Sequence, residues 1–183
     1  MEFTSVENEY VVLKLSLSDY QPTKHELDDE YVICGSEIRN KIRRPERKFL
    51  KQNFENWTSP YYGKMKGWQN DSAIYVLHNG RLVAGVYLCS ENEFDHGERW
   101  GQLHYAFMDP AYKGKGIYSV LFQRAVEKAK SWNLEGLILN SDRYLLPDVY
   151  IRWGAVPWKT IPKNARPVGS SLLVEVIRRA LSR

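Results

Sequence analysis

The 183-residue chain is 43% hydrophobic and 26% charged, a balance that predicts one folded domain over residues 1–183. Its two cysteines are too few for a secreted disulfide framework, and no apolar run approaches the roughly 20 residues that span a bilayer. The acidic first residues lack the basic and apolar regions of a signal peptide. We therefore expect a cytoplasmic protein with no membrane partner.

The positive charge of the chain is concentrated in one segment. The formal net charge is +4, but residues 39–51 hold seven basic side chains and one acid, a local +6, so the remainder carries 4 − 6 = −2. Such a segment can bind nucleic acid, form a solvated helical face, or attract an anionic substrate. We favour the solvated face and regard a nucleic-acid partner as unlikely on composition alone.

The first 71 residues predict one strand and two helices. Aliphatic residues with partial alternation predict a strand over Tyr10–Leu17. Roughly helical spacing of apolar residues predicts a helix over Tyr31–Arg44, and Pro45 can begin a second helix that ends near Trp57. Thr58–Asp71 has no period and predicts a loop, whose aromatic rings either line a pocket or cover the edge of the core.

The middle of the chain predicts three antiparallel strands. Ala73–His78 and Arg81–Ser90 flank Asn79-Gly80, a dipeptide that tolerates the positive φ angles of a tight hairpin turn. A polar turn follows, and Trp100–Met108 predicts the third strand.

A change to parallel pairing is predicted next. Apolar residues from Ile117 to Trp132 trace one helical stripe, and Leu134–Ser141 reads as a buried strand, so the unit is a right-handed crossover. Pro147 can open a short helix that ends near Gly154. Val156–Ile161 predicts a short strand, and Leu172–Leu181 favours a helix.

The stretch from Asp109 to Ser119 links the third strand to the long helix. Lys113-Gly114-Lys115-Gly116 places two glycines and two ammonium groups at the helix N-terminus, where backbone N–H groups converge on an anion. The stretch matches neither the P-loop nor the dinucleotide-binding fingerprint. It therefore predicts a phosphate-bearing ligand held by a different motif.

At these residues the sequence resembles the Gcn5-related N-acetyltransferase (GNAT) superfamily. Its signature, x-P-x-x-[QR]-x-x-G-x-[GA] after a strand that ends in an apolar residue, is similar to Met108–Tyr118, and its L-Y-x-x-x-G-F motif is similar to Val149–Ala155. Two positions differ: Lys113 replaces Gln or Arg, and Tyr118 replaces Gly or Ala. The resemblance implies an α/β (α+β) fold with a mixed, mostly antiparallel central sheet and helices on both faces.

The resemblance also implies acetyl-CoA as the cofactor and direct transfer of its acetyl group to an acceptor amine. The residues expected to bind the cofactor are Phe107, Met108, Lys113, Gly114, Lys115, Gly116, Tyr118 and Ser119. Tyr150 takes the role of the acid that protonates the departing CoA sulfur. His104, on the third strand, is the favoured general base because histidine titrates near neutrality. Glu91 and Asp109 are weaker candidates for that base.

Several questions stay open at this level. His104 can instead be a structural histidine of the sheet. The bulky Tyr118 favours an alternative function for the protein, a regulatory or binding module that binds CoA weakly or not at all. The acceptor can be a small-molecule or peptide amine, and a homodimer is compatible with the sequence. His25, His78 and His96 show no metal-ligand spacing, so no metal site is predicted.

Overall fold

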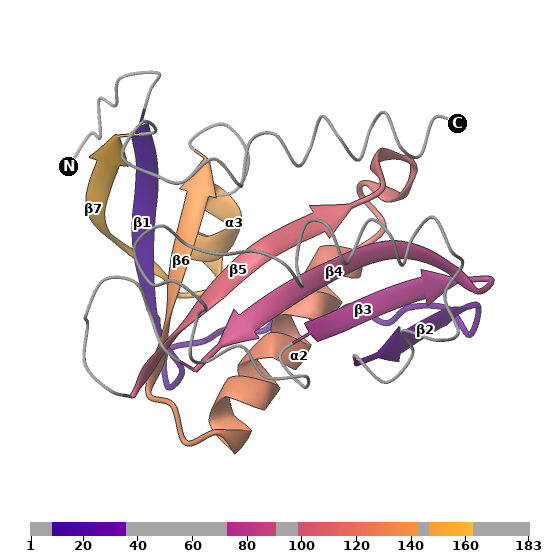
Figure 1. Cartoon of the computed structure of the whole chain (residues 1–183), viewed down its shortest axis with the longest axis horizontal. Helices are drawn as coiled ribbons and strands as arrows, with labels where there is room; N and C mark the ends of the chain where they lie inside the picture. Colours follow the sequence, from indigo (N-terminus) through magenta and orange to yellow (C-terminus); the bar gives the residue numbers. More distant parts are fainter. Residues whose placement is uncertain (1–8, 36–72, 91–98, 143–146, 163–183) are drawn as a thin grey trace, which may run out of the picture.

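The computed structural model of the chain describes residues 9–35, 73–90, 99–142 and 147–162. In these residues a seven-stranded sheet has the strand order β2-β3-β4-β5-β6-β1-β7, and helix α2 packs on it (Figure 1). The strands are β1 (Glu9–Ser16), β2 (Tyr31–Cys34), β3 (Ala73–His78), β4 (Arg81–Cys89), β5 (Trp100–Met108), β6 (Gly136–Asp142) and β7 (Val156–Pro162). The helices are the 3-10 helix η3 (Pro110–Tyr112), α2 (Ile117–Ser131) and α3 (Pro147–Arg152).

The hairpin and the third antiparallel strand are confirmed. β3 and β4 pair in antiparallel register, and the turn residues Asn79 and Gly80 have φ angles of 49° and 74°. These are the positive values that a tight two-residue hairpin turn requires. β5 pairs antiparallel with β4 on the other side.

The predicted strand–helix–strand unit, formed by β5, α2 and β6, is also confirmed, with α2 one residue shorter than predicted. β5 and β6 are the parallel pair of the described sheet, and every other pairing is antiparallel. Leu137, Ile138 and Leu139 of β6 have no exposed surface, as expected of a strand that is covered on both faces. The sheet is therefore mixed and mostly antiparallel, as predicted.

The helix predicted from Tyr31 is wrong over its first four residues, which form the edge strand β2. Tyr31 and Ile33 pack against the core, whereas Val32 is 54% exposed, so burial alternates as in a strand. Four residues are too few for apolar spacing to distinguish this alternation from a helical period. The rest of that helix, the helix after Pro45, the aromatic loop and the predicted tail helix lie outside the described residues.

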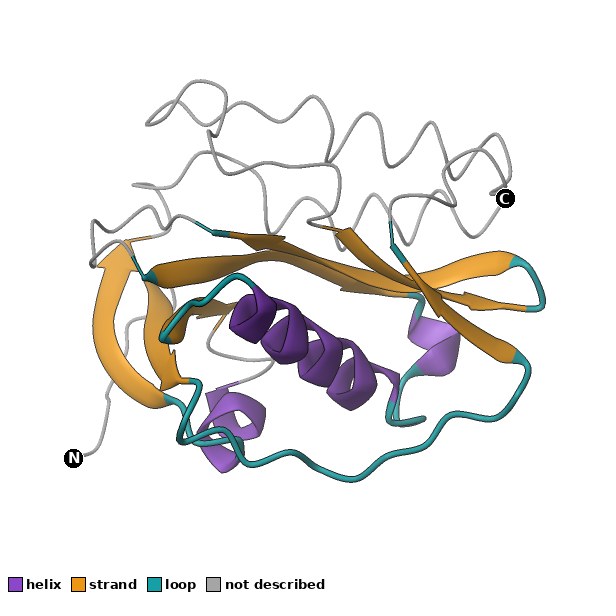
Figure 2. Ribbon diagram, turned by 90° about the horizontal axis from the view of Figure 1, so that it is seen from below, coloured by secondary structure: helices purple, strands orange, loops and turns teal. Residues whose placement is uncertain are grey.

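The first strand lies far from the second. β1 is inserted between β6 and β7 and is antiparallel to both, whereas β2 forms the opposite edge of the sheet. Residues 17–30, which we call the crossover segment, must therefore pass across the molecule, and Figure 2 shows this path as a long loop. The sequence did not predict this order.

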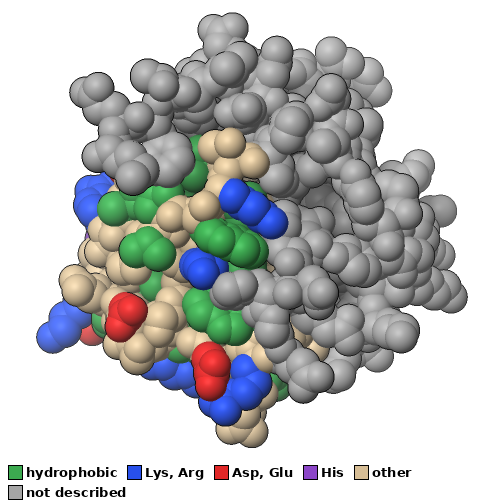
Figure 3. Space-filling view, turned by 90° about the vertical axis from the view of Figure 1, so that its left-hand side faces the viewer, with side chains coloured by type: hydrophobic (Ala, Val, Ile, Leu, Met, Phe, Trp, Pro, Cys, Tyr) green, Lys and Arg blue, Asp and Glu red, His purple; other side chains and the backbone are tan. Residues whose placement is uncertain are grey.

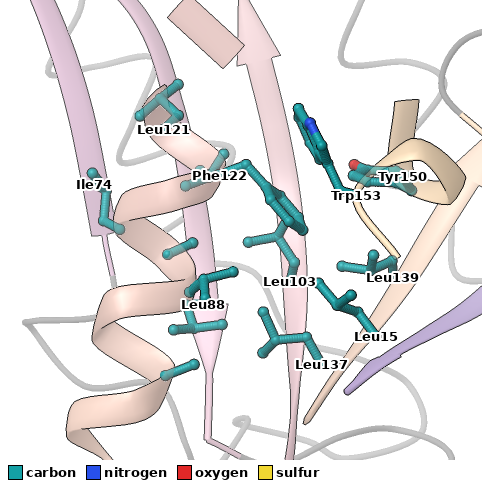
Figure 4. Close-up of a cluster of buried hydrophobic side chains, with 14 of the residues drawn as sticks. Leu15, Ile74, Leu88, Leu103, Leu121, Phe122, Leu137, Leu139, Tyr150 and Trp153 are labelled. Carbon is teal, nitrogen blue, oxygen red and sulfur yellow. The ribbon is translucent and has the colours of Figure 1, made fainter. Parts of the chain in front are cut away.

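Of the described elements, helices α2 and α3 pack on one face of the sheet, where they share a core (Figures 2 and 4). The buried side of α2 includes Leu121, Phe122 and Val126, and the Phe122 ring stacks on Trp153, with centroids 4.5 Å apart. Full burial of a side chain such as Phe122 contributes roughly 1.5–3 kcal/mol. This contact joins the long helix to the short segment that carries Tyr150.

The side of the molecule that β7 forms is different in character. Figure 3 faces this side and shows hydrophobic and basic side chains intermixed among the described residues. Val156 is 57% exposed, and the ammonium of Lys159 lies 4.2 Å from the centre of the Trp158 ring. The lysine charge and the indole face attract each other there.

Candidate active site

The loop before α2 has the backbone shape of an anion cradle. Gly114 and Gly116 have φ angles of 82° and 74°, and residues other than glycine seldom adopt such positive values. Gly116 is the N-cap residue of the 15-residue helix α2, so no side chain caps the helix. The first turn of α2 contains no acidic residue. The N–H groups of a first turn lack intrahelical acceptors and carry partial positive charge. This end of α2 is therefore suited to an anion.

The side chains of the loop add to this potential. Lys113, Gly114 and Lys115 are exposed, and a β-carbon placed on Gly114 would have no atom within 4 Å. The Lys115 ammonium lies 5.1 Å from the centre of the Tyr112 ring. The residues present thus fit a pyrophosphate: the loop is open, cationic and rich in backbone donors.

The strand end before the loop is held by a buried carboxylate. Asp109 is 6% exposed, accepts a hydrogen bond from the Ala111 N–H at 3.0 Å, and pairs with the Arg81 guanidinium at 3.2 Å. Its own N–H donates to the Val83 carbonyl at 2.7 Å. Asp109 is therefore a structural residue that caps η3, which weakens its candidacy as a base.

A second network anchors η3 from the side of the sheet edge. The His78 ring lies 3.0 Å from the Tyr112 hydroxyl through Nδ1 and 2.9 Å from a Glu30 carboxylate oxygen through Nε2. Tyr31 packs on the same imidazole, with ring centres 4.6 Å apart. These contacts tie β3 and the end of the crossover segment to the loop that carries Lys113.

β5 leaves its parallel partner before it reaches the loop. The β5–β6 ladder pairs Trp100–Leu103 with Gly136–Leu139, and beyond these pairs the two strands diverge (Figure 1). A bulge accompanies the divergence: Gly85 pairs with Phe107 but Tyr87 pairs with His104, so two β5 residues oppose one β4 residue. Bulges bend a strand and are common beside active sites.

The predicted residues Phe107 and Met108 lie on the diverging part of β5. Phe107 is buried and Met108 is partly buried against the core. A β-carbon on Gly85 would lie 2.7 Å from the Phe107 ring, so glycine is required for that ring to pack across the β4–β5 pair. Ser119, another predicted residue, lies partly exposed in the first turn of α2.

Tyr118 turns its ring away from the loop and towards α3. Its ring stacks on Trp153, with centres 6.0 Å apart and planes 28° apart, and contacts Phe122 at 6.5 Å. Its hydroxyl is hydrogen-bonded to the Tyr150 hydroxyl. The bulky residue that replaces the small residue of the family signature therefore packs in an aromatic cluster, which we define as Tyr118, Phe122, Tyr150 and Trp153.

Burial governs the acidity of both hydroxyls. Desolvation raises the pKa of Tyr118 well above its usual value, and the Coulombic interaction and hydrogen bond with Tyr150 raise it further. Desolvation also raises the pKa of Tyr150, to about 12, although the hydrogen bond with Tyr118 opposes that increase. Both phenols therefore keep their protons at neutral pH.

The end of α3 fixes the position of Tyr150. The Ala155 N–H donates to the Tyr150 carbonyl at 2.9 Å, and the Gly154 N–H donates to the Ile151 carbonyl at 3.0 Å. These two bonds, with Gly154 at a φ of 99°, form a Schellman cap, and they confirm the predicted C-cap glycine. Trp153 is held in turn by a 2.7 Å hydrogen bond from its indole N–H to Thr23.

The crossover segment brings a residue that sequence reasoning missed. A β-carbon placed on Gly116 would lie 2.8 Å from His25 Nδ1, so this imidazole lies directly against the loop. Tyr20 of the same segment contacts Phe122, with ring centres 5.7 Å apart. No local pattern could have revealed His25, because it reaches the loop only through the position of β1 in the sheet.

The favoured general base and one of its alternatives lie outside the described side chains. His104 lies in β5 opposite Tyr87, but its side chain is outside the described part of the chain, as is Glu91. Over the described ranges, no cluster of three or more His, Cys, Asp or Glu side chains could hold a metal ion. Within the same ranges no helix is long and apolar enough to cross a bilayer.

Comparison with solved structures shows the fold. A GCN5-related glucosamine N-acetyltransferase region of a fungal multi-domain GH3 β-N-acetylglucosaminidase is 20% identical, with a TM-score of 0.57 over 84% of this chain and 20% of that one. A tandem GNAT protein of the clavulanic acid biosynthesis pathway is 10% identical, with a TM-score of 0.56 over 85% and 54%. A GCN5-related N-acetyltransferase from Sphaerobacter thermophilus is 14% identical, with a TM-score of 0.53 over 91% and 54%.

The chain spans only about a fifth to about half of the length of those three proteins. A search of curated proteins gave no match. The model of the Acetyltransferase (GNAT) family matches residues 39–145, more than half of the chain, and these residues include β3 to β6, α2 and the cationic loop. Sequence and fold agree, and the chain belongs to the Acetyltransferase (GNAT) family.

Proposed function

We propose that the protein transfers an acetyl group from acetyl-CoA to an amine by direct attack while both are bound. The observation that carries this proposal is the combination of an open cationic loop at the uncapped start of α2 with the Tyr150 hydroxyl beside it. Acetyl-CoA supplies an activated acetyl thioester. The remaining chemistry falls to the residues of the chain.

The loop and the first turn of α2 are proposed to bind the pyrophosphate. Backbone N–H groups from Gly114 to Ser119 and the two exposed ammonium groups supply the donors and the charge, whereas the Lys113 N–H already donates to the Pro110 carbonyl. The diverging edge of β5 at Phe107 and Met108 is proposed to hold the pantetheine arm. The proposal places the thioester near Tyr150.

Tyr150 is proposed to act as the general acid. Its pKa of about 12 keeps it protonated at neutral pH, so a proton is available for the leaving sulfur. Its own helix cap and the Trp153 ring, which meets it edge to face with ring centres 6.0 Å apart, hold the Tyr150 ring in place. A fixed donor loses little entropy when the reaction occurs.

His104 remains the proposed general base. It belongs to β5 next to the bulge, at the point where the strand loses its pairing with β6 but keeps its pairing with β4. An imidazole with an ordinary pKa near 6.5 can take a proton from an amine in the physiological range.

A second candidate, a GNAT module without turnover, is favoured by one contact. The Tyr150 hydroxyl is already bonded to Tyr118, an interaction that could withhold the acid from the sulfur. Binding and turnover separate the two functions, because such a module can bind acetyl-CoA without releasing CoA.

The experiment is calorimetry with acetyl-CoA beside an acceptor screen that measures release of the CoA thiol. The screen covers small amines, amino sugars, amino acids, and peptides with a free N-terminus or lysine. Tyr150→Phe should lower turnover by roughly 100-fold or more and leave acetyl-CoA affinity unchanged. His104→Gln should remove the acidic limb of the pH–rate profile.

Each result has a defined meaning. Absence of binding at millimolar acetyl-CoA contradicts the proposal, and binding without release for any acceptor supports the module. Unchanged turnover in Tyr150→Phe removes Tyr150 from the mechanism, and a persistent acidic limb in His104→Gln places the base elsewhere.

A further inference from the structure

The hydroxyls of Tyr118 and Tyr150 form a partly buried pair that the family signature does not contain. Tyr118 comes from the first turn of α2 and Tyr150 from α3, and their rings meet edge to face with centres 6.2 Å apart. Trp153 contacts both rings, at 6.0 Å each, and Phe122 contacts both as well. The packing therefore holds the two oxygens together without help from a charged group.

One hydrogen bond between two hydroxyls can be donated by either partner. If Tyr150 donates, its only proton points at Tyr118 and is withheld from other groups. If Tyr118 donates, the Tyr150 oxygen is the acceptor and the Tyr150 proton can point elsewhere. The two arrangements thus predict opposite effects of removing the Tyr118 oxygen.

Proton donation by Tyr150 favours the arrangement in which Tyr118 donates the hydrogen bond. When Tyr150 gives up its proton, negative charge develops on its oxygen, and a hydrogen bond to an ionised oxygen is roughly twice as strong as one between neutral groups. The Tyr118 hydroxyl already lies at that oxygen. A donor in place before the charge forms requires no reorganisation at the moment of reaction.

We propose, resting on the proposed function, that Tyr118 is a positioning residue whose hydroxyl donates to the Tyr150 oxygen and directs the Tyr150 proton towards the leaving sulfur. In this step the Tyr150 O–H bond breaks and an S–H bond forms. The charge left on the Tyr150 oxygen is held by Tyr118, which keeps its own proton. Tyr150 then regains a proton from solvent, which balances the proton released by the acceptor amine.

The surroundings of the pair make Tyr118 the main modulator of Tyr150. The charged or titratable groups on the neighbouring elements include the exposed Asp148 and Arg152 of α3, Lys113 and Lys115 of the loop, and Asp19 and His25 of the crossover segment. Tyr20 of the crossover segment is partly buried, and its ring contacts Phe122. Solvent screens those exposed groups, whereas Tyr118 acts on Tyr150 inside the aromatic cluster. The hydrogen bond from Tyr118 opposes the increase that burial causes in the pKa of Tyr150.

Tyr118→Phe is the direct test, because it keeps the ring contacts and removes the oxygen. Turnover should fall roughly ten- to hundredfold, the effect of losing one hydrogen bond to a charged oxygen, while acetyl-CoA affinity by calorimetry stays within about twofold. The solvent isotope effect on turnover should rise, because proton donation becomes slower. Tyr20→Phe is the matched control: it removes the hydroxyl of another ring that contacts Phe122 and should change none of these quantities.

A double-mutant cycle separates a role through Tyr150 from a structural one. Adding Tyr118→Phe to Tyr150→Phe should cost almost nothing further, because the acid is already gone. Additive losses, unchanged turnover in Tyr118→Phe, or higher turnover would each overturn the proposal. If Tyr150→Phe does not lower turnover, Tyr150 is not the acid and the proposed function loses its mechanism. If Tyr150→Phe lowers turnover but Tyr118→Phe does not, only the role of Tyr118 is contradicted.

A spectroscopic measurement covers the case in which a variant fails to fold. In the unsubstituted protein, labelled at the tyrosine ζ-carbons and free of ligand, the bonded hydroxyl proton should give a downfield NMR resonance with cross-peaks to both rings. In Tyr118→Phe the Tyr150 ζ-carbon resonance should shift, and in Tyr20→Phe it should not. A Tyr150 hydroxyl that exchanges as freely as an exposed phenol would contradict the bond.

Discussion

The first turn of α2 separates two regions of opposite physical character. On one side the loop from Lys113 to Gly116 is exposed, cationic and shaped by two positive φ angles. On the other side the aromatic cluster is apolar, with Tyr150 and Trp153 each only 3% exposed. The loop is suited to a charged ligand from solvent, and the cluster is suited to holding one proton donor in a dry environment.

The difference shows how one helix terminus can serve two purposes. Water around the loop screens its charges, so its lysines attract an anion weakly and adjustably. Three of the four rings of the cluster are buried, so a single hydroxyl there has a larger effect on its neighbour. Substitutions on the cluster side should therefore act on stability and turnover, and those on the loop side should act on cofactor affinity.

The largest effect is expected from Phe122→Ala, which opens the cluster. Phe122 has no exposed surface and stacks on Trp153, so its removal should lower the free energy of unfolding by about 3–5 kcal/mol. Urea unfolding followed by circular dichroism measures the change. Lys130→Ala, at an exposed position of the same helix, is the control and should stay within about 0.5 kcal/mol of the unsubstituted protein. A loss below about 1 kcal/mol for Phe122→Ala would show that the cluster is not part of the core.

On the loop side, Gly116→Ala and Gly114→Ala form a matched pair. Both glycines have positive φ, so each alanine should cost about 1–2 kcal/mol of strain. At Gly116 the new methyl group must also displace His25, whereas at Gly114 it meets no atom within 4 Å. We expect Gly116→Ala to weaken acetyl-CoA binding roughly tenfold more than Gly114→Ala, as measured by calorimetry.

The double variant His25→Ala/Gly116→Ala checks the cause. Removal of the imidazole should recover part of the binding that Gly116→Ala loses. Equal losses of acetyl-CoA affinity in Gly114→Ala and Gly116→Ala would show that backbone strain alone causes the loss. The His25 imidazole would then move aside without an energetic cost.

The strength of local signals explains which elements could be predicted. Asn79-Gly80 specifies its turn through backbone angles, and the apolar stripe of α2 extends over four turns, so both were found from the sequence. β2 was misread because it has four residues and its burial depends on β3. The position of β1 between β6 and β7 depends on pairing with residues at least 120 positions away, which no local pattern encodes.

The same reasoning applies to the candidate site. The glycines and lysines of the loop are contiguous, so their convergence at a helix start follows from the sequence, as does the packing of Tyr118 near Phe122 one turn later. The bond between Tyr118 and Tyr150 joins two helices, and the contact of His25 with Gly116 needs the whole path of the crossover segment. Such contacts require the tertiary fold.

The smallest effect is expected from the lysines of the loop. Lys113→Met and Lys115→Met each keep most of the apolar stem and remove one exposed charge, so each should weaken acetyl-CoA binding by about 0.3–1 kcal/mol, a factor of roughly two to five. Calorimetry at low and high salt measures this loss, which should shrink as salt rises because solvent ions screen exposed charges. Lys130→Met, near the other end of α2, should have no effect at either salt concentration. A loss that is independent of salt would mean that the lysine makes a direct, water-excluded contact, and the cationic loop would then share the dry character of the aromatic cluster.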